Sequence, residues 1–327
     1  SNIALLLTTG ETRLDSYNRM AEILRRTELR GKDLATNLEF HYGLVHGFIG
    51  NGINARPSTR FIVPYLTAVG LLKEQANQLD LDYAYGQIRQ RYLEANAEQA
   101  AEWAAVLDAK KLLFTRPLER LFAEPHYMSG WLSINKKALV IKDGSIEWLE
   151  NPILLLDRLY HYLNMDFEVG KPARYMIWDH DHDILDAAVG FYKSLEEKLG
   201  TADFTAIQKA LGSDAAPAGF SGDEWAAVRS AHAGYMAGTE LLAVLAHIAS
   251  STGFFELAVQ PDLSIEIPER LTEESLQKRM AKVLVPPPVA KSDEILAASG
   301  GMFYPREAPG MDVFVNEGDH FEAGDTL

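Results

Sequence analysis

Apolar side chains recur every three or four residues through most of the sequence, which is the spacing of amphipathic α-helices. Some of these stretches also carry end signals. Asn151-Pro152 is typical of a helix start, Ser221 with Glu224 forms a capping-box pattern, and Gly200 and Gly212 mark helix ends. Helices are predicted over Asp15–Leu29, Leu34–His46, Phe61–Leu79, Ala84–Leu113, Ile153–Leu163, Ile184–Leu199, Phe204–Leu211, Trp225–Ser250 and Thr272–Leu284.

Alternation with a period of two, which is typical of strands, appears in fewer places. Ala138–Lys142 and Ser145–Leu149 alternate and are joined by Asp143-Gly144, so they predict a β-hairpin with a tight turn. Shorter strands are predicted at Ile3–Thr8, Arg174–Trp178 and Leu263–Ile267. Loops are predicted at Gly50–Gly52 and Gly212–Gly222, and a stiff linker at Pro286–Pro288. The pattern as a whole predicts an α+β protein that is predominantly helical.

The composition excludes some kinds of site, and the charge is distributed unevenly along the chain. The 327 residues include no cysteine, which excludes disulfides, thiolate metal sites and a cysteine nucleophile. The net charge is −15, and so acidic a protein is a poor candidate for general nucleic-acid binding. Residues 138–327 hold 14 basic and 31 acidic side chains, whereas residues 1–137 hold 17 and 15. The acidic part therefore suits basic protein partners better than anionic coenzyme A or ATP.

The apolar stretches are too short to span a bilayer. Ile153–Leu156 and Leu241–Ile248 are the most apolar, and both fall far below the roughly 20 residues that a membrane helix needs. The chain does not open with a basic, apolar, cleavable leader. We therefore expect a cytoplasmic protein that does not bind a membrane.

The run Asp179-His180-Asp181-His182-Asp183 is the first candidate for a chemical site in the sequence. Histidine and carboxylate side chains are suitable ligands for zinc or iron. Neighbouring residues point in different directions, however, and the sequence offers no second ligand pair at a recognised spacing; His126 and His161 are isolated. The favoured interpretation is an acidic, solvated turn in which Asp181 or Asp183 caps the following helix. A metal-dependent enzyme using this run is the alternative.

Other polar residues form no recognisable active site. His41, His46, His232 and His247 fall within predicted helices, where a histidine is more often structural than catalytic. The pairs Lys110-Lys111 and Lys136-Lys137 could contact a phosphate but are typical of solvated helix ends. Phosphate-loop, nucleophile-elbow and dinucleotide-binding motifs are absent from the sequence. The sequence thus predicts no catalytic, cofactor-binding or metal-ligating residue within these 327 residues.

The C-terminal stretch carries the most specific motifs. Gly301-Met-Phe-Tyr304 is followed by Ala308–Phe314, by Glu317-Gly318-Asp319 and by Gly324–Leu327. This order closely resembles the first half of a biotin carboxyl carrier domain of the acetyl-CoA carboxylase type, in which a proline-containing "thumb" precedes the next strand. The resemblance implies a barrel-sandwich fold, and a biotinyl lysine expected just after Leu327.

The N-terminal stretch resembles the end of a biotin carboxylase domain. The matching residues are Gly10-Glu11-Thr12-Arg13, Asn18-Arg19-Met20, Thr36-Asn37 and Thr59-Arg60-Phe61. The segment Lys32–Ala35 departs from the family because it is longer than the usual spacer. This resemblance covers about the first 65 residues and implies an α/β remnant.

Together the two resemblances imply three parts of a biotin-dependent acyl-CoA carboxylase: the end of the biotin carboxylase at 1–65, a mostly helical linking domain at 66–288, and the carrier start at 289–327. The parent enzyme would be a ligase that uses ATP, bicarbonate, magnesium and biotin to carboxylate an acyl-CoA. This segment would be non-catalytic and inactive alone. It would organise the biotin carboxylase and carboxyltransferase domains, as part of a homo-oligomeric enzyme.

Two alternatives to this function stay open besides the metal enzyme. The chain could be a stand-alone helical interaction module whose ends resemble a carboxylase by chance. The middle domain could also be a rigid spacer rather than a docking unit. Docking is favoured because Trp103, Trp131, Trp148, Trp178 and Trp225 could anchor either a core or an interface.

Overall fold

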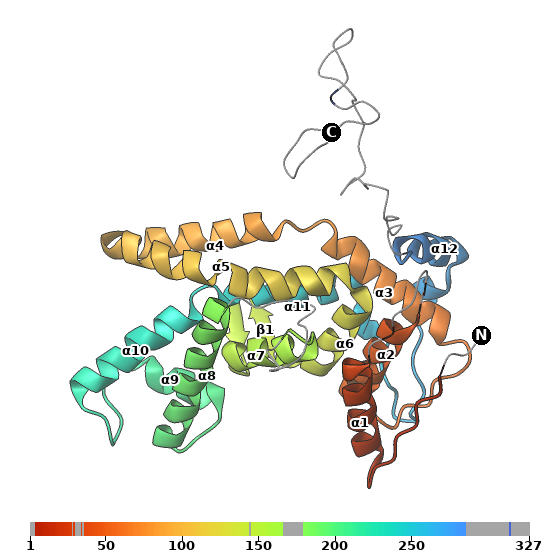
Figure 1. Cartoon of the computed structure of the whole chain (residues 1–327), viewed down its shortest axis with the longest axis horizontal. Coiled ribbons are helices and arrows are strands. Elements are labelled where there is room, and N and C mark those ends of the chain that lie inside the picture. The colour runs from red at the N-terminus through yellow and green to blue at the C-terminus, as the bar shows by residue number, and fades with distance from the viewer. Residues whose placement is uncertain are drawn as a thin grey trace. The chain divides into compact units, whose positions relative to one another are not determined.

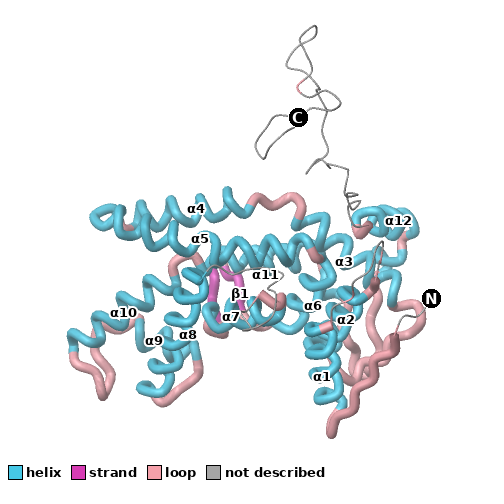
Figure 2. The backbone as a smooth tube through the Cα atoms, in the orientation of Figure 1, coloured by secondary structure: helices cyan, strands magenta, loops and turns pink. Residues whose placement is uncertain are grey.

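A computed structural model describes residues 4–27, 29, 34, 36–143, 145–165, 179–285 and 314 of the chain. The chain divides into two units, Ser1–Val285 and Pro286–Leu327, and all the elements below belong to the first (Figure 1). The prediction of a predominantly helical fold is confirmed, because the described residues form helices and one small sheet (Figure 2). The flanking α/β and all-β parts, and the boundaries at residues 65 and 288, stay predictions.

The described residues contain twelve α-helices, four short 3-10 helices and one β-hairpin, joined by turns and loops. In chain order they are α1 Arg13–Arg26, α2 Leu38–Asn51, α3 Ile62–Ala76, α4 Leu81–Ala95, η1 Ala97–Gln99, α5 Ala100–Ala123, α6 Pro125–Asn135, β1 Leu139–Lys142, β2 Ser145–Trp148, α7 Pro152–Tyr162, α8 Asp179–Leu199, α9 Phe204–Leu211, α10 Gly222–Met236, η2 Thr239–Leu242, α11 Ala243–Thr252, η3 Phe254–Glu256, η4 Glu269–Thr272 and α12 Glu274–Val283.

Helix α5 runs through the core of this unit. Leu107, Phe114, Leu118 and Leu121 recur along it at helical spacing and are completely buried. Helix α4 lies beside its first half, whereas α6, α7 and α8 contact it further along (Figure 1). The helix therefore joins the α4 side of the unit to the group formed by α8, α9 and α10.

Helix α5 continues through a proline. Pro117 has no N–H, so the carbonyl of Leu113, four residues earlier, loses its usual helical donor. The hydroxyl of Tyr160, on α7, donates to this buried carbonyl at 2.8 Å. A side chain from another helix thus supplies the hydrogen bond that the proline removes, and α5 stays continuous at that point.

Helices α2 and α6 approach each other through glycine and serine. A Cβ atom at Gly43 would overlap the carbonyl oxygen of His126, and one at Gly50 would overlap the carbonyl of Ser133. Gly47, on the same helix, has open space where its Cβ would be. The backbones of the two helices therefore touch at Gly43 and Gly50, which makes α2 and α6 a tightly packed pair.

Tyrosine hydroxyls tie the helices around this contact to one another. Tyr42, on α2, donates to the backbone carbonyl of Tyr162 at 2.7 Å, and the hydroxyl of Tyr162 donates to the carbonyl of Tyr127 at 2.7 Å. Tyr65, on α3, bonds the hydroxyl of Ser129 at 3.0 Å. Burial raises the pKa of Tyr65 to about 12 and that of Tyr162 well above its usual value, so both hydroxyls keep their protons at neutral pH.

Predictions that rest on local turn and cap chemistry are confirmed. The hairpin pairs Leu139 with Trp148 and turns at Asp143, whose φ of 48° is the positive value that this turn requires. Asn151 caps α7 through a bond from the backbone N–H of Ile153, and Pro152 is the first helical residue. Ser221 and Glu224 form the predicted capping box of α10.

Two predicted long helices are each broken. The predicted helix Ala84–Leu113 is divided between α4 and α5, which form a helical hairpin. Helix α4 ends just before Asn96, whose side chain donates to the carbonyl of Tyr92 at 2.8 Å. Trp225–Ser250 is broken as well, because Gly238 takes a left-handed φ of 89° between α10 and η2. The prediction missed both breaks because the surrounding residues all favour helix.

Two of the strands predicted outside the hairpin are wrong. Within Ile3–Thr8, the described residues 4–8 form no strand, and Leu5 and Leu7 are 81% and 80% exposed. A strand needs a pairing partner, and no bridge to this segment forms within the described residues. The prediction of a strand at Leu263–Ile267 is also wrong. This segment makes a single bridge, Val259 to Ile265, and Leu263 has a φ of 68°.

Some predicted boundaries also move. The first helix begins after Thr12, which accepts from the N–H of Asp15, and ends at Arg26, before Leu29. Helix α2 extends beyond His46 to Asn51, so part of the predicted loop Gly50–Gly52 is helical. The predicted strand Arg174–Trp178, the linker Pro286–Pro288 and the carrier motifs at 301–304 and 317–327 lie outside the described residues.

Candidate functional site

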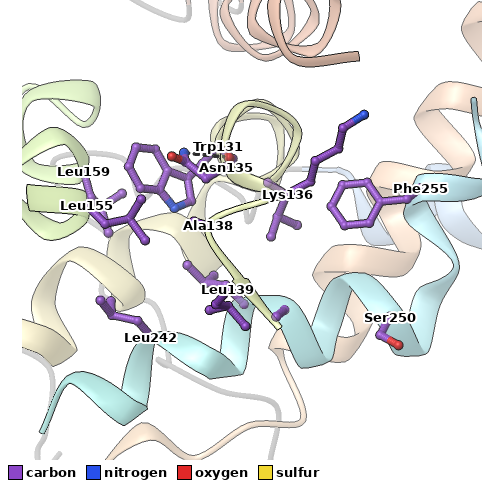
Figure 3. A pocket seen from close by; sticks show the side chains of 13 residues that line it. Trp131, Asn135, Lys136, Ala138, Leu139, Leu155, Leu159, Leu242, Ser250 and Phe255 are labelled. Carbon is purple, nitrogen blue, oxygen red and sulfur yellow. Dashed lines mark hydrogen bonds between the residues drawn. The ribbon is translucent and has the colours of Figure 1, made fainter. Parts of the chain in front are cut away.

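An apolar pocket of about 210 Å³ lies among elements that are distant in sequence (Figure 3). Helices α6 and α7, strand β1 and the η2–α11–η3 stretch each contribute side chains to its wall. The larger apolar ones that Figure 3 labels are Trp131, Leu139, Leu155, Leu159, Leu242 and Phe255. Most of these side chains are buried or half-buried, so the pocket is a hollow in the core that reaches the surface.

Three polar residues join the lining of this pocket: Asn135, Lys136 and Ser250. The amide of Asn135 donates to the carbonyl of Trp131 at 3.0 Å. The ammonium of Lys136 donates to Oδ1 of Asn51 at 2.9 Å and points away from the apolar side chains (Figure 3). Burial, and then the neighbouring Lys137, lower the pKa of Lys136. The pocket thus combines hydrocarbon walls with one exposed cation at its edge.

A second, wider groove of about 740 Å³ runs between α4, the β-hairpin and the η2–α11 stretch. Arg91 and Glu240 form an ion pair of 2.6 Å beside it, and Tyr92 and His247 also line it. Burial and the Glu240 carboxylate raise the pKa of Tyr92 to about 12. The acid in this groove is therefore held by an arginine and a protonated phenol rather than being available to a reacting group.

The buried histidines serve packing. His46 contacts the carbonyl of Tyr42 through Nδ1 at 2.9 Å, and His232 contacts the hydroxyl of Tyr192 at 2.8 Å. Burial lowers the pKa of His46, His126 and His232 to about 4, so these imidazoles are neutral at pH 7. His41 and His247 are exposed. None of the five forms a paired acid–base set with a carboxylate in a pocket of the described residues.

The interpretation of the acidic run as a solvated turn is wrong. Residues 179–183 form the first turns of α8, and Asp181 is 3% exposed. The guanidinium of Arg116, on α5, contacts the Asp181 carboxylate at 2.8 Å. Within the described residues no group of three or more histidine and carboxylate side chains could hold a metal ion. Asp181 therefore joins α8 to α5 as half of an ion pair.

The lysine pairs have separate contacts. Lys111 pairs with Asp82 at 2.9 Å on the surface. Lys110 is buried instead: its ammonium donates to the carbonyl of Gly234 near the end of α10 and lies 5.4 Å from the centre of the Tyr235 ring. Burial lowers the pKa of Lys110 to about 8. These contacts fasten the last turn of α10 to α5, which is a structural role.

Lys110 has a testable consequence for stability. In the unfolded chain its pKa returns toward 10.5, so between pH 8 and pH 10.5 the unfolded state binds more protons than the folded state. The free energy of unfolding therefore increases, on account of Lys110, as the pH rises through this range. We expect the wild type to gain about 2 kcal/mol over the Lys110→Met variant between pH 7 and pH 10, in urea unfolding. A difference between the two proteins that stays constant with pH would contradict the assignment.

Tryptophans contribute to the core more than to an interface. Trp131, Trp148 and Trp225 are buried, and the indole N–H of Trp225 donates to the carbonyl of Ser213 at 2.9 Å. Trp103 is partly buried against Tyr92, with ring centres 5.7 Å apart. Trp178 lies outside the described residues. Of the two roles that the sequence left open, core or interface anchor, Trp131, Trp148 and Trp225 therefore have the first.

The two pockets differ in the polar groups that line them. The apolar pocket has Asn135, Lys136 and Ser250 as its polar lining, and the wider groove places its Glu240 carboxylate in an ion pair. None of the helices in the described part of the chain is both long and apolar enough to cross a bilayer. The pocket was not predicted from the sequence, because its walls come from three separate stretches of the chain, 131–139, 155–159 and 242–255. Lys136 was noted only as one of a solvated pair.

Comparisons with protein-family models, curated proteins and solved structures find no match to this chain. The family resemblance therefore rests on the motifs at the two ends. The C-terminal motifs lie outside the described residues apart from Phe314, whereas most of the N-terminal motifs lie within them.

Proposed function

We propose that this chain is a central segment of a biotin-dependent acyl-CoA carboxylase of the acetyl-CoA carboxylase type. The observation that carries the proposal is the pair of resemblances in family order, with carboxylase motifs at Gly10–Arg13 and carrier motifs at Gly301–Tyr304 and Gly324–Leu327. In that enzyme the segment is non-catalytic. It joins the biotin carboxylase, the carboxyltransferase and the biotin carrier.

The local structure around the N-terminal motif supports the proposal, because three of the matching residues, Gly10, Thr12 and Arg19, help to shape one turn. Gly10 lies where a Cβ atom would overlap the backbone nitrogen of Ser16. Thr12 caps α1 at 3.1 Å, and Arg19 donates to the carbonyl of Thr9 at 2.7 Å. A motif whose members shape one turn together is a more specific signal than the same letters scattered over unrelated positions.

The exposed segment before α1 also supports a joining role. Leu5 and Leu7 present apolar side chains to solvent, while Thr8 is tied to Ser16 by bonds of 2.9 and 3.1 Å. Exposed apolar chain next to an anchored turn is typical of a segment that packs against another domain. In this proposal the segment packs against the rest of the biotin carboxylase domain, while docking by the helical part at 66–288 stays a separate prediction, preferred to a rigid spacer.

The experiment examines the natural full-length protein. We expect streptavidin to detect it, and mass spectrometry of its peptides to find biotin on a lysine shortly after residue 327. The purified enzyme should consume ATP in a bicarbonate-dependent and acyl-CoA-dependent reaction. Replacing that lysine with arginine should abolish both the streptavidin signal and acyl-CoA carboxylation. A full-length protein that carries no biotin and no ATP-dependent carboxylase domain would overturn the proposal in favour of a stand-alone interaction module.

A further inference from the structure

The apolar pocket between α6, β1, α7 and α11 is larger than an ordinary packing gap. Its volume is about 210 Å³, whereas a dry apolar cavity of about 150 Å³ is enough to hold benzene. Protein interiors leave few voids larger than one water molecule, because unfilled space forfeits contacts. A hollow of this size with leucine walls therefore has the character of a site for a hydrocarbon.

We propose that this pocket binds an unbranched amphiphile, with a hydrocarbon chain of roughly eight carbons in the hollow and an anionic or polar acyl end at its edge. The chain length follows by scaling from the six carbons of benzene. Leu155 and Leu159 of α7 and Leu242 of η2 lie around the hollow (Figure 3). Leu245 of α11 also lines it, so the hydrocarbon chain has aliphatic contacts from several elements.

Lys136 defines the end of the pocket where the head group lies. Its ammonium is exposed and already bonded to a neutral amide oxygen, that of Asn51, so no carboxylate needs to be displaced for an anion to approach. Lys137 follows directly and is also exposed. Water is a poor occupant of the hollow itself, because the walls are mostly hydrocarbon and the polar lining lies in three residues.

This site goes beyond the proposed function and does not depend on it. It needs no biotin, no ATP and no second domain, and it can be measured on the chain of 327 residues. A carboxylase without ligand binding here, or ligand binding in a protein that is not a carboxylase, would separate the two proposals.

Isothermal titration with octanoate tests the pocket. Ala246 lines the hollow, so Ala246→Phe fills part of it and should weaken octanoate binding at least tenfold. Ala243→Phe is the matched control, since Ala243 lies on the same helix but lines the wider groove. Thermal unfolding should show that both variants are folded. Of the two variants, only Ala243→Phe should have its melting temperature raised by octanoate. No octanoate binding by the wild type at millimolar concentration, or equal binding by both variants, would overturn the proposal.

Lys136→Gln tests the head group. Because Lys136 is exposed, we expect a loss of about threefold in octanoate affinity and no change for 1-octanol, which has no charge. Lys137→Gln is the matched control, because Lys137 does not line the pocket. Octanoate affinity that is indifferent to both lysines would remove the anionic end from the proposal and overturn it in this form.

The source of the acyl chain is decided by competition. Octanoyl-CoA that displaces octanoate, when coenzyme A alone does not, identifies an acyl thioester as the ligand. Octanoate binding that octanoyl-CoA leaves unchanged identifies a free carboxylate. Both results support a hydrocarbon site, whereas displacement of octanoate by coenzyme A alone would show that the head group rather than the chain is recognised, and would overturn it.

Discussion

Alanine in place of Gly43 will lower the free energy of unfolding by about 3 kcal/mol, the upper part of the usual cost of overpacking. The new methyl group would overlap the backbone carbonyl oxygen of His126, which cannot rotate away as a side chain can. Helix α2 would have to move off α6, and the hydrogen bond from Tyr42 to the carbonyl of Tyr162 would stretch with it. Guanidinium unfolding followed by far-ultraviolet circular dichroism measures the loss.

Gly47→Ala is the matched control on the same helix. Its Cβ would meet open space, so only the helix-forming advantage of alanine over glycine remains. That advantage is about 0.5–1 kcal/mol and should make the control more stable than the wild type. If Gly43→Ala and Gly47→Ala have the same unfolding midpoint, the close approach of α2 and α6 does not exist as described.

Arg116→Met should lower the free energy of unfolding by about 4 kcal/mol, because it leaves the buried Asp181 carboxylate without its arginine. The ion pair is 2.8 Å long, and Asp181 is nearly inaccessible to solvent. Since the pair joins α5 to α8, resistance of α8 to proteolysis should fall together with global stability. Urea unfolding and limited proteolysis with peptide mapping measure the two effects.

The matched control for this variant is Arg89→Met. Arg89 and Asp108 form an equally short ion pair at 2.8 Å, also with α5 as one partner, but on the surface. We expect little change there, because solvent screens exposed pairs. The double variant Arg116→Met with Asp181→Leu should recover most of the lost stability, since it removes the buried charge as well. A double variant as unstable as Arg116→Met alone would show that the carboxylate has another essential partner.

Local signals in the sequence predict local structure well. Asn151-Pro152, the capping box of Ser221 and Glu224, and the Asp143 turn all act within four residues, and the structure has each of them as predicted. Such features depend on the backbone groups next to them, so no knowledge of the rest of the fold is needed.

Features that depend on distant contacts could not be predicted in the same way. Asp181 has the sequence surroundings of a solvated cap, but in the fold it is buried and pairs with Arg116, 65 residues earlier in the chain. The leucines at 5 and 7 have the pattern of a buried strand but find no pairing partner within the described residues. Burial and pairing are properties of the whole fold, and periodicity reports only what one segment could do.

The candidate pocket illustrates the same limit. Lys136 stands out in the sequence as one of a lysine pair, but nothing local shows that Leu155, on α7, and Leu242, on η2, close a hollow beside it. The sequence left open whether the tryptophans anchor a core or an interface for a related reason. Trp131 and Trp148 carry no local sign of how many neighbours will cover them.

The proline in α5 has a consequence for the order in which the chain is completed on the ribosome. Residues 113–117 are synthesised long before Tyr160, which follows Leu113 by 47 positions. Until α7 emerges, Tyr160 cannot donate to the carbonyl of Leu113, and α5 lacks the hydrogen bond that replaces the one removed by Pro117. The middle of the longest helix in the described residues is therefore finished by a residue made afterwards, which couples its continuity to vectorial synthesis.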